Sequence, residues 1–123
     1  MTCPGKKVIK SEKVPAAIGP YSVAVTGGPF VFTAGQIGLN PATGILVEGG
    51  VEPETRQALE NLKSILIAAN SCLENVVKTS VFLKDMADFA KMNAIYAEFF
   101  TIDFPARSAV QVAALPKNAA FEI

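Results

Sequence analysis

The chain has 123 residues, enough for one domain built around a single hydrophobic core. Its 11 Lys and Arg residues balance its 11 Asp and Glu residues, and no basic tract is present, which argues against a broad phosphate-binding surface. Histidine is absent and only two cysteines occur, so no metal site is expected, and the unpatterned cysteines fit a reducing cytoplasm. Hydrophobic residues make up 50% of the chain, which predicts that another subunit covers some apolar surface.

Nothing in the sequence predicts export or membrane insertion. Residues 1–7 are not followed by a long apolar run, so they do not resemble a secretory signal. No apolar segment approaches the ~20 residues of a membrane-spanning helix. A cytoplasmic location is therefore expected.

The first third of the chain predicts three short strands. We expect them at residues 7–9, 22–26 and 30–35, where β-branched and aromatic residues gather. The turn signal Gly27-Gly28-Pro29 separates the second strand from the third, so these two strands form a predicted hairpin. Residues 39–50 contain Asn-Pro and Thr-Gly pairs and are expected to form mostly loop.

A long amphipathic helix is expected after this loop. Pro53 suits its first position, and the negative charges of Glu52 and Glu54 complement the positive helix N-terminus. Apolar residues recur at helical spacing until Asn70, where we expect the helix to end. The predicted apolar face consists of Ala58, Leu59, Leu62, Ile65, Leu66 and Ala69.

A strand over residues 75–84 and a second helix come next. Alternation along the strand gives one face that consists of Val77, Thr79, Val81 and Leu83. Asp85 is expected to cap the second helix, with Asp88 in its first turn. The apolar face of this helix consists of Phe89, Met92, Tyr96, Phe99 and Phe100.

A strand that carries a single arginine follows. Pro105 fixes its own backbone and favours an extended Phe104, so the strand is expected to start at Ala106. One of its faces, predicted to lie in the core, carries Ser108, Val110, Val112 and Ala114. The opposite face, interpreted as a pocket wall, carries Arg107, Ala109, Gln111, Ala113 and Leu115. Arginine is a planar fork that binds a carboxylate through two parallel hydrogen bonds.

A final strand over residues 120–123 completes the order β-β-β-α-β-α-β-β. This order predicts a single α+β domain over residues 1–123, with both helices on one face of a mixed sheet. The opposite sheet face is then uncovered, and we expect the Arg107 side of its strand to belong to it. Because that face carries many small apolar residues, a second subunit is expected to cover it.

Several segments resemble one known family. Pro-Ala-Arg-Ser at residues 105–108 and Phe-Glu-Ile at residues 121–123 are similar to the signature of the RidA/YjgF/UK114 proteins. Further similarity lies at residues 16–21, 32–37, 77–85 and 93–100. The resemblance covers nearly the whole chain, and it implies a chorismate-mutase-like fold that forms homotrimers with sites in the clefts between subunits.

The resemblance assigns two catalytic candidates. It implies that Arg107 binds a substrate carboxylate, although a surface or interface ion pair is the commoner role of an arginine. Glu122 points away from the face of Phe121 and Ile123 and, taken alone, reads as a solvent-facing carboxylate. By resemblance, Glu122 orients and activates a water molecule, and a partly desolvated carboxyl of this kind has a raised pKa.

Four further residues are candidates for substrate binding. Tyr21 would line the pocket, or anchor the rim of the hairpin as an aromatic residue. The backbone of Gly35 would approach the ligand, although a bulge or turn glycine is the simpler interpretation. Asn93 would line the site or, as its residue type and position favour, form a helix-to-strand hydrogen bond. At Ala109 many relatives carry cysteine, so only its backbone could serve a ligand here.

The resemblance implies a 2-iminobutanoate/2-iminopropanoate deaminase that hydrolyses reactive imino acids to 2-keto acids and ammonia without a cofactor. The alternatives are a non-catalytic trimer that binds small keto or imino acids, and a ribonuclease or translation inhibitor. The chain also stops at Ile123, where relatives usually continue the last strand.

The sequence also predicts that each site combines two chains. If the last two strands paired as a hairpin, Glu122 would lie opposite about Ala113, and Arg107 would be roughly 20 Å away. One small substrate could not reach both side chains of the same chain. A cyclic trimer would instead place the arginine of one subunit beside the glutamate of the next.

Overall fold

The computed structural model describes residues 5–123, and its elements follow the predicted order. The strands are β1 (Lys6–Ile9), β2 (Ala24–Gly27), β3 (Phe30–Thr33), β4 (Lys78–Leu83), β5 (Ala106–Gln111) and β6 (Phe121–Glu122). The helices are α1 (Val51–Ala68) and α2 (Phe89–Phe99), with short 3₁₀ turns at Leu73–Asn75, Met86–Asp88 and Pro116–Asn118. Both predicted helices and all six predicted strands are therefore confirmed, with boundaries that differ by a few residues.

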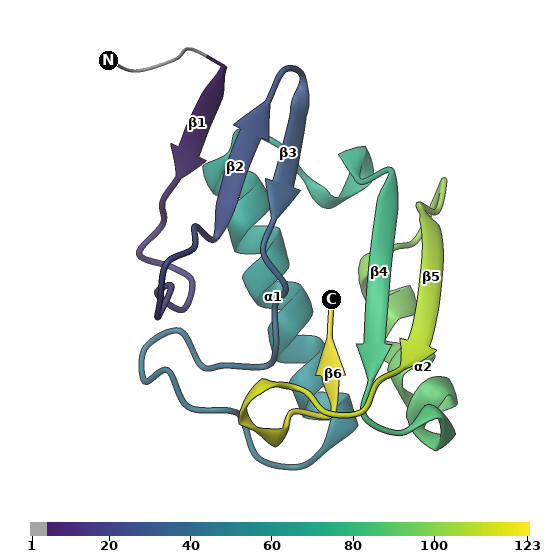
Figure 1. Ribbon diagram of the computed structural model, residues 1–123. Helices are drawn as coiled ribbons and strands as arrows, with labels where there is room; N and C mark the ends of the chain where they lie inside the picture. The colour runs from purple at the N-terminus through teal and green to yellow at the C-terminus, as the bar shows by residue number, and fades with distance from the viewer. Residues whose placement is uncertain (1–4) are drawn as a thin grey trace.

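The strands form two three-stranded sheets that meet at one point. In the first, β1, β2 and β3 pair antiparallel in that order. In the second, β4 lies between β5, which is parallel to it, and β6, which is antiparallel. Gln36 and Ile123 join the halves by exchanging two backbone hydrogen bonds, with N–O distances of 2.7 and 3.0 Å. Figure 1 accordingly shows the C-terminus between β3 and β4.

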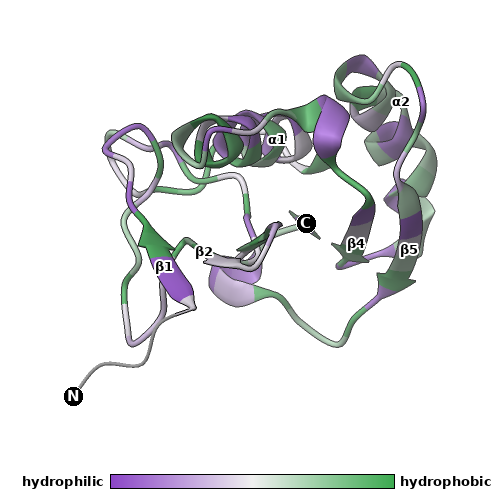
Figure 2. Ribbon diagram, turned by 90° about the horizontal axis from the view of Figure 1, so that it is seen from above, coloured by the Kyte–Doolittle hydropathy of each residue, from purple (hydrophilic) through white to green (hydrophobic). Residues whose placement is uncertain are grey.

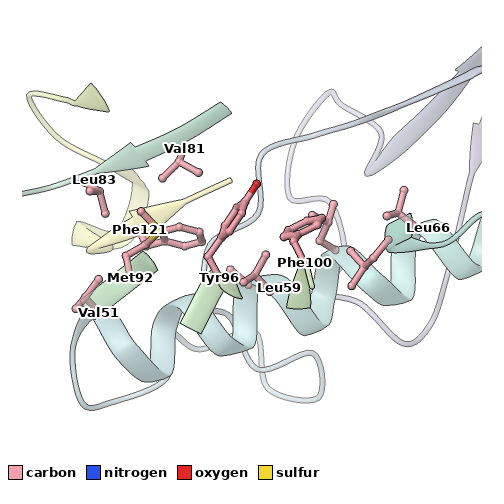
Figure 3. Close-up of a cluster of buried hydrophobic side chains, with 12 residues drawn as sticks. Val51, Leu59, Leu66, Val81, Leu83, Met92, Tyr96, Phe100 and Phe121 are labelled. Atoms are coloured by element: carbon pink, nitrogen blue, oxygen red, sulfur yellow. The ribbon is translucent and has the colours of Figure 1, made fainter. Parts of the chain in front are cut away.

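Both helices lie on the same side of the strands (Figure 2). The main core joins α1 and α2 to β4 and β6, with Leu59, Met92 and Phe121 completely buried. Figure 3 shows these side chains converging between the helices and the second sheet. The α+β prediction with two helices on one sheet face is thus confirmed, because the apolar faces of both helices pack where their periodicity places them.

The helix termini differ slightly from the prediction. Helix α1 begins at Val51 rather than Pro53, after Gly50, whose φ of 88° is typical of glycine. Pro53 is still within the first turn, where its missing N–H needs no partner. Asp85 caps the short turn that leads directly into α2, because its Oδ1 accepts a hydrogen bond from the N–H of Ala87 at 2.9 Å.

The predicted faces of β5 are reversed in the structure. Parallel pairing places Arg107 beside Thr79 and Ala109 beside Val81, and both of these β4 residues are buried under the helices. Arg107 and Ala109 therefore belong to the helix-covered face, whereas Val110 is 45% exposed on the opposite face. The expectation that Arg107 lies on the uncovered face was wrong, because alternation fixes which residues share a face but the neighbouring strand decides which face is covered.

The helix-free face still carries apolar side chains. Phe30 and Phe32 of β3 are 55% and 59% exposed, and Val8 of β1 lies in the same cross-strand row as Phe32. Within residues 5–123, no helix combines the length and the apolar character that crossing a bilayer requires.

Candidate functional site

Helix α2 holds the Arg107 side chain from one side. The guanidinium Nη1 donates a hydrogen bond to Oδ1 of Asn93 at 2.7 Å. Its central carbon lies 4.7 Å from the centre of the Tyr96 ring and 5.4 Å from that of Phe89. Stacking on aromatic faces and hydrogen bonding together orient a guanidinium while leaving other N–H groups available. The helix-to-strand hydrogen bond favoured for Asn93 is therefore present, and its partner is the candidate arginine itself.

A buried hydrogen bond fixes the ring beneath Arg107. The hydroxyl of Tyr96 lies 2.9 Å from Oγ1 of Thr79, and both residues are more than 90% buried. Because a buried hydroxyl costs free energy unless it is paired, each of these groups holds the other in place. From the sequence pattern, Tyr96 was expected only as part of an apolar helix face. The available signal was Thr79, a polar residue on an otherwise apolar strand face.

Glu122 occupies a different environment on β6. The adjacent Phe121 is completely buried, so Glu122 projects to the helix-free face, as predicted from alternation. Burial raises the pKa of the Glu122 carboxyl above its usual value of 4.5. Among residues 5–123, no side-chain hydrogen bond of Glu122 is present to offset this effect.

Gly35 makes room for the Glu122 carboxyl group. A Cβ atom added at Gly35 would lie 2.8 Å from Cδ of Glu122 and 3.0 Å from both carboxylate oxygens. These distances are shorter than van der Waals contact, so a side chain at position 35 would displace the carboxyl group. Gly35 is therefore a close-approach glycine, as one interpretation proposed, although the group that approaches it is Glu122.

The other two candidates divide between these environments. Tyr21 is 51% exposed, and its hydroxyl accepts a hydrogen bond from the N–H of Ile18 at 3.4 Å. The carbonyl of Val23 accepts from the N–H of Ala34, so Tyr21 lies at the same end of the β2–β3 ladder as Gly35. Ala109 lies on the Arg107 face and packs against the main core.

The six candidates thus form two groups rather than one site. The arginine group contains Arg107, Asn93 and Ala109, and the glutamate group contains Glu122, Gly35 and Tyr21. The two charged residues project from opposite faces of the second sheet, since Arg107 pairs with the buried Thr79 and Glu122 pairs with Phe82.

The pairing of the strands that carry Arg107 and Glu122 also differs from the prediction. The hairpin prediction was wrong, because β4 lies between β5 and β6. Thr79 and Phe82 are three positions apart and two strand spacings intervene, so the Cα atoms of Arg107 and Glu122 are about 14 Å apart. Separation and opposite orientation together prevent one small substrate from contacting both residues within one chain.

Glu54 fixes the start of β6, a contact that the sequence pattern did not predict. Its Oε1 accepts a hydrogen bond from the N–H of Ala120 at 2.8 Å, which ties α1 to the start of β6. The residue is only 5% exposed, and burial raises the pKa of its carboxyl, partly offset by the hydrogen bond from Ala120 and by Lys84. The signal in the sequence was its place one turn before Ala58, on the buried face of α1.

The donor set gives no indication of a metal centre. Within residues 5–123, no group of three or more His, Cys, Asp or Glu side chains is arranged to hold a metal ion.

Relatives of known sequence match over most of the chain. A RutC family protein from Pyrococcus horikoshii is 53% identical over 118 residues, which cover 96% of this chain and 94% of that protein. The human 2-iminobutanoate/2-iminopropanoate deaminase is 51% identical over 118 residues, with 96% and 86% coverage. The crystal structure of E. coli TdcF with bound serine superimposes with a TM-score of 0.90 at 42% identity, covering 94% of this chain and 93% of that one.

A family model described as Endoribonuclease L-PSP matches residues 11–123. Solved structures with similar folds include a member of the Rid protein family from Yersinia pestis, at a TM-score of 0.93, 43% identity, and 95% and 94% coverage. The family model covers nearly all of the described residues, and the arginine group and the glutamate group both lie within the matched range. The chain belongs to the RidA/YjgF family.

Proposed function

We propose that this chain is a 2-iminobutanoate/2-iminopropanoate deaminase, which hydrolyses the C=N bond of reactive imino acids. The observation that carries the proposal is the orientation of Arg107. Within residues 5–123 its guanidinium uses one hydrogen bond, to Asn93, and is stacked on two rings. The remaining N–H groups suit a substrate carboxylate. Relatives about half identical in sequence carry this activity in their names.

Each group of residues has a separate task in the proposed reaction. Arg107 binds the carboxylate and holds the neighbouring C=N carbon in place. Glu122 accepts a proton as water adds to that carbon, so that a C–O bond forms and the C=N bond becomes C–N. Glu122 then returns the proton to nitrogen, which gives a carbinolamine. As the C–N bond breaks, the hydroxyl oxygen forms the C=O bond and its proton passes through Glu122 to the departing nitrogen, so that ammonia and a 2-keto acid leave. A carboxyl group with a raised pKa suits this shuttle near neutral pH.

The reacting groups come from two subunits of a proposed homotrimer. Arg107 and Glu122 face opposite sides of one sheet, so a single chain cannot supply both to one small substrate. Arg107 lies on β5, which is an edge strand, and Glu122 lies on the face that carries the exposed Phe30 and Phe32. An edge that meets the helix-free face of the next subunit would join the two groups and cover these apolar side chains.

We further propose a small imino acid as the partner, a cytoplasmic location and no cofactor. Water addition and proton transfer suffice for imine hydrolysis, so the mechanism requires no metal. The balance of 11 basic and 11 acidic residues gives no support to nucleic acid as a partner.

A coupled assay tests the activity directly. An amino-acid oxidase generates the imino acid in the presence of semicarbazide, which traps whatever imine survives. Addition of this protein should lower the semicarbazone yield and raise the rate of keto acid formation, whereas the Arg107→Ala protein should not. An unchanged yield with folded wild-type protein would reject the enzymatic proposal. Saturable binding of a 2-keto acid without turnover would instead identify a binding trimer.

RNA cleavage is the second candidate, because the matching family model is described as an endoribonuclease. The absence of histidine and the zero net charge count against it. RNA cleavage that copurifies with the protein and disappears in a single point variant would establish it. We expect no such cleavage.

A further inference from the structure

Glu54 is a buried carboxyl group that the proposed mechanism does not use. It lies in the first turn of α1, and its Oε1 accepts the hydrogen bond from the N–H of Ala120. Burial raises the pKa of the Glu54 carboxyl more than Ala120 and Lys84 together lower it. Because desolvation opposes a buried charge of this kind, it adds little to stability, and what it supplies is a fixed direction for one backbone N–H group.

Glu54 replaces one acceptor of the ladder between β4 and β6. The carbonyl of Ala120 accepts from the N–H of Lys84 at 3.1 Å. In a regular antiparallel ladder, opposed residues exchange both hydrogen bonds, so the carbonyl of Lys84 would accept in turn from the N–H of Ala120. That N–H instead donates to Glu54 at 2.8 Å. Ala120 is thus held by two elements, β4 and α1, one residue before β6 begins (Figure 1).

The α1 end of this contact is rigidly packed. A Cβ atom added at Gly38 would lie 2.7 Å from both the Cα and the carbonyl oxygen of Glu54, so the chain after β3 lies directly on this turn of the helix. Further along α1, the buried Asn61 donates from Nδ2 to the carbonyl of Leu39 at 2.9 Å. Helix α1 therefore fixes the chain that follows Gly35 and, through Glu54, also fixes β6.

The turn before β6 does not hold the strand in place by itself. Lys117 and Asn118 have φ values of 55° and 56°, in the left-handed region that residues other than glycine disfavour. Such a conformation persists where the surrounding contacts determine it. Ala119 and Phe121 are completely buried, but apolar burial has no direction. The hydrogen bond to Glu54 is what sets the position of the chain along the strand.

The position of β6 in turn decides where the Glu122 carboxyl lies. Glu122 follows Ala120 by two residues, so by alternation it forms the next hydrogen-bonded pair, with Phe82. Its carboxyl carbon lies so close to Gly35 that a Cβ atom there would be 2.8 Å away. A small shift of β6 would therefore move the carboxyl group relative to Gly35 and to a substrate beside it.

We infer that Glu54 is a positioning residue for the proposed reaction: it fixes Ala120 and thereby holds the Glu122 carboxyl beside Gly35, where water adds to the substrate. The inference rests on the proposed function. Glu54 extends from a helix on the covered side of the sheet, whereas Glu122 projects to the helix-free face. Glu54 thus touches no reacting atom and acts only through the backbone of β6.

Two substitutions separate the hydrogen bond from the charge. Glu54→Gln removes the charge and keeps an oxygen that accepts from Ala120, whereas Glu54→Met fills similar space without an acceptor. The methionine variant should lower kcat about tenfold, since small displacements of a catalytic group are costly, and the glutamine variant by less than about twofold. KM should change little in either, because Arg107 binds the substrate. Unchanged kcat in Glu54→Met, or equal losses in both variants, would overturn the inference.

A double-mutant cycle tests whether Glu54 acts through Glu122. In a Glu122→Gln background there is no catalytic carboxyl to displace, so Glu54→Met should lower the residual rate by less than about twofold. The same tenfold loss in both backgrounds would show that Glu54 affects activity by another route and would reject the positioning role.

Carbon-13 NMR of the side-chain carboxyl groups provides a test without turnover, with Glu122→Gln to assign the Glu122 signal. Glu54→Met should lower the pKa of Glu122 toward 4.5, because a displaced carboxyl regains water. Glu54→Gln should not, since burial and not the charge of Glu54 raises that pKa. An unchanged pKa in Glu54→Met would overturn the inference. A wild-type protein without imine hydrolysis would reject the proposed function, while this comparison would still decide whether Glu54 positions Glu122.

A backbone change covers the case of a misfolded methionine variant. Lactic acid incorporated in place of Ala120 exchanges only its N–H for an ester oxygen and keeps every other side chain, Glu54 included. This protein should show the lower kcat and the lower Glu122 pKa expected of Glu54→Met, with circular dichroism as the folding control. A folded ester protein with wild-type kcat and wild-type Glu122 pKa would show that the Glu54–Ala120 hydrogen bond does not position Glu122.

Discussion

The arginine group and the glutamate group hold their charges in opposite ways. Arg107 is fixed by a hydrogen bond to Asn93 and by the rings of Tyr96 and Phe89, all from one helix of the same chain. Glu122 has no side-chain hydrogen bond among residues 5–123, and its pKa is raised by burial alone. Packing thus fixes the orientation of the Arg107 guanidinium for a carboxylate partner. Desolvation instead raises the pKa of the Glu122 carboxyl, which suits it to proton exchange.

This difference separates binding from proton transfer in the proposed reaction. The geometry of the arginine group is complete within one subunit, so its loss should remove substrate binding wherever the subunit is placed. The setting of Glu122 depends on what covers the helix-free face, so its role should depend on assembly. The following predictions test this contrast, beginning with the largest expected effect.

Replacement of Arg107 should abolish most of the activity. Arg107→Ala removes the only proposed carboxylate ligand, and loss of a charged hydrogen-bonded partner of this kind typically costs about 2–5 kcal/mol, or roughly 30-fold to several thousandfold in kcat/KM. Arg107→Lys should fail similarly, because an ammonium cannot form the bidentate contact or stack on Tyr96. Steady-state kinetics, with circular dichroism as the folding control, measure the effect. Near-normal activity of either variant would remove the role assigned to Arg107.

Mixed assemblies should regain activity that neither parent has. Arg107→Ala and Glu122→Gln proteins are unfolded together in equal amounts and refolded. Random assembly places one intact arginine beside one intact glutamate in about a quarter of all sites, so activity should return to about a quarter of wild type. Each variant refolded alone is the control. Inactive trimers of confirmed mixed composition would show that the two groups do not share a site.

The sequence was sufficient for the element order because local periodicity determines most of it. Helical spacing in α1 and α2 identified their buried sides correctly, and alternation grouped the buried Thr79, Val81 and Leu83 of β4 on one face. Val77 was predicted on the same face but precedes β4 and is 69% exposed. The faces of β5 were misassigned for a physical reason. Each of its faces mixes polar and apolar side chains, so the side on which Arg107 and Ala109 lie is decided by the parallel register with β4, which is a tertiary property.

The sequence supplied candidates for the site but not their arrangement. Family resemblance supplied Arg107 and Glu122, but the ring of Tyr96 under the guanidinium was hidden within an ordinary apolar helix face. The sequence also did not predict that β4 lies between β5 and β6, because a short turn between two strands favours a hairpin. Here the 3₁₀ turn Pro116–Asn118 instead carries the chain past the end of β4.

A methyl group at Gly35 should impair catalysis more than folding. Gly35→Ala places a Cβ within 3.0 Å of the Glu122 carboxyl, which can rotate away because it is the end of a flexible side chain. Displacement of a catalytic group by about 1 Å can lower the rate by about 100-fold, and partial relaxation should reduce this to roughly tenfold in kcat. Gly27→Ala is the matched control, since its Cβ would contact only the ring of Phe32, at 3.3 Å.

The outcome for Gly35→Ala discriminates between two roles of the glycine. A loss of kcat with little change in unfolding midpoint supports the close approach to Glu122. A loss of stability equal to or greater than that of Gly27→Ala, with unchanged kcat, would indicate that Gly35 serves only the backbone conformation after β3.

The smallest expected effect is on stability, and its sign follows from the raised pKa of Glu122. The folded protein binds this proton more tightly than the unfolded chain does, so the stabilisation is fully present below the unfolded value of about 4.5 and is lost as pH rises through the folded pKa. At pH 7, which lies above the unfolded value, the raised pKa of Glu122 therefore costs the wild-type protein stability that Glu122→Gln does not lose. Urea unfolding at fixed protomer concentration should show the variant to be more stable at pH 7, with the difference vanishing near pH 4. Glu54, whose pKa is also raised, is present in both proteins and cancels in the comparison.

A variant that is less stable than wild type at pH 7 would mean that the Glu122 carboxylate gains a favourable partner on assembly, and that burial does not govern the pKa of Glu122.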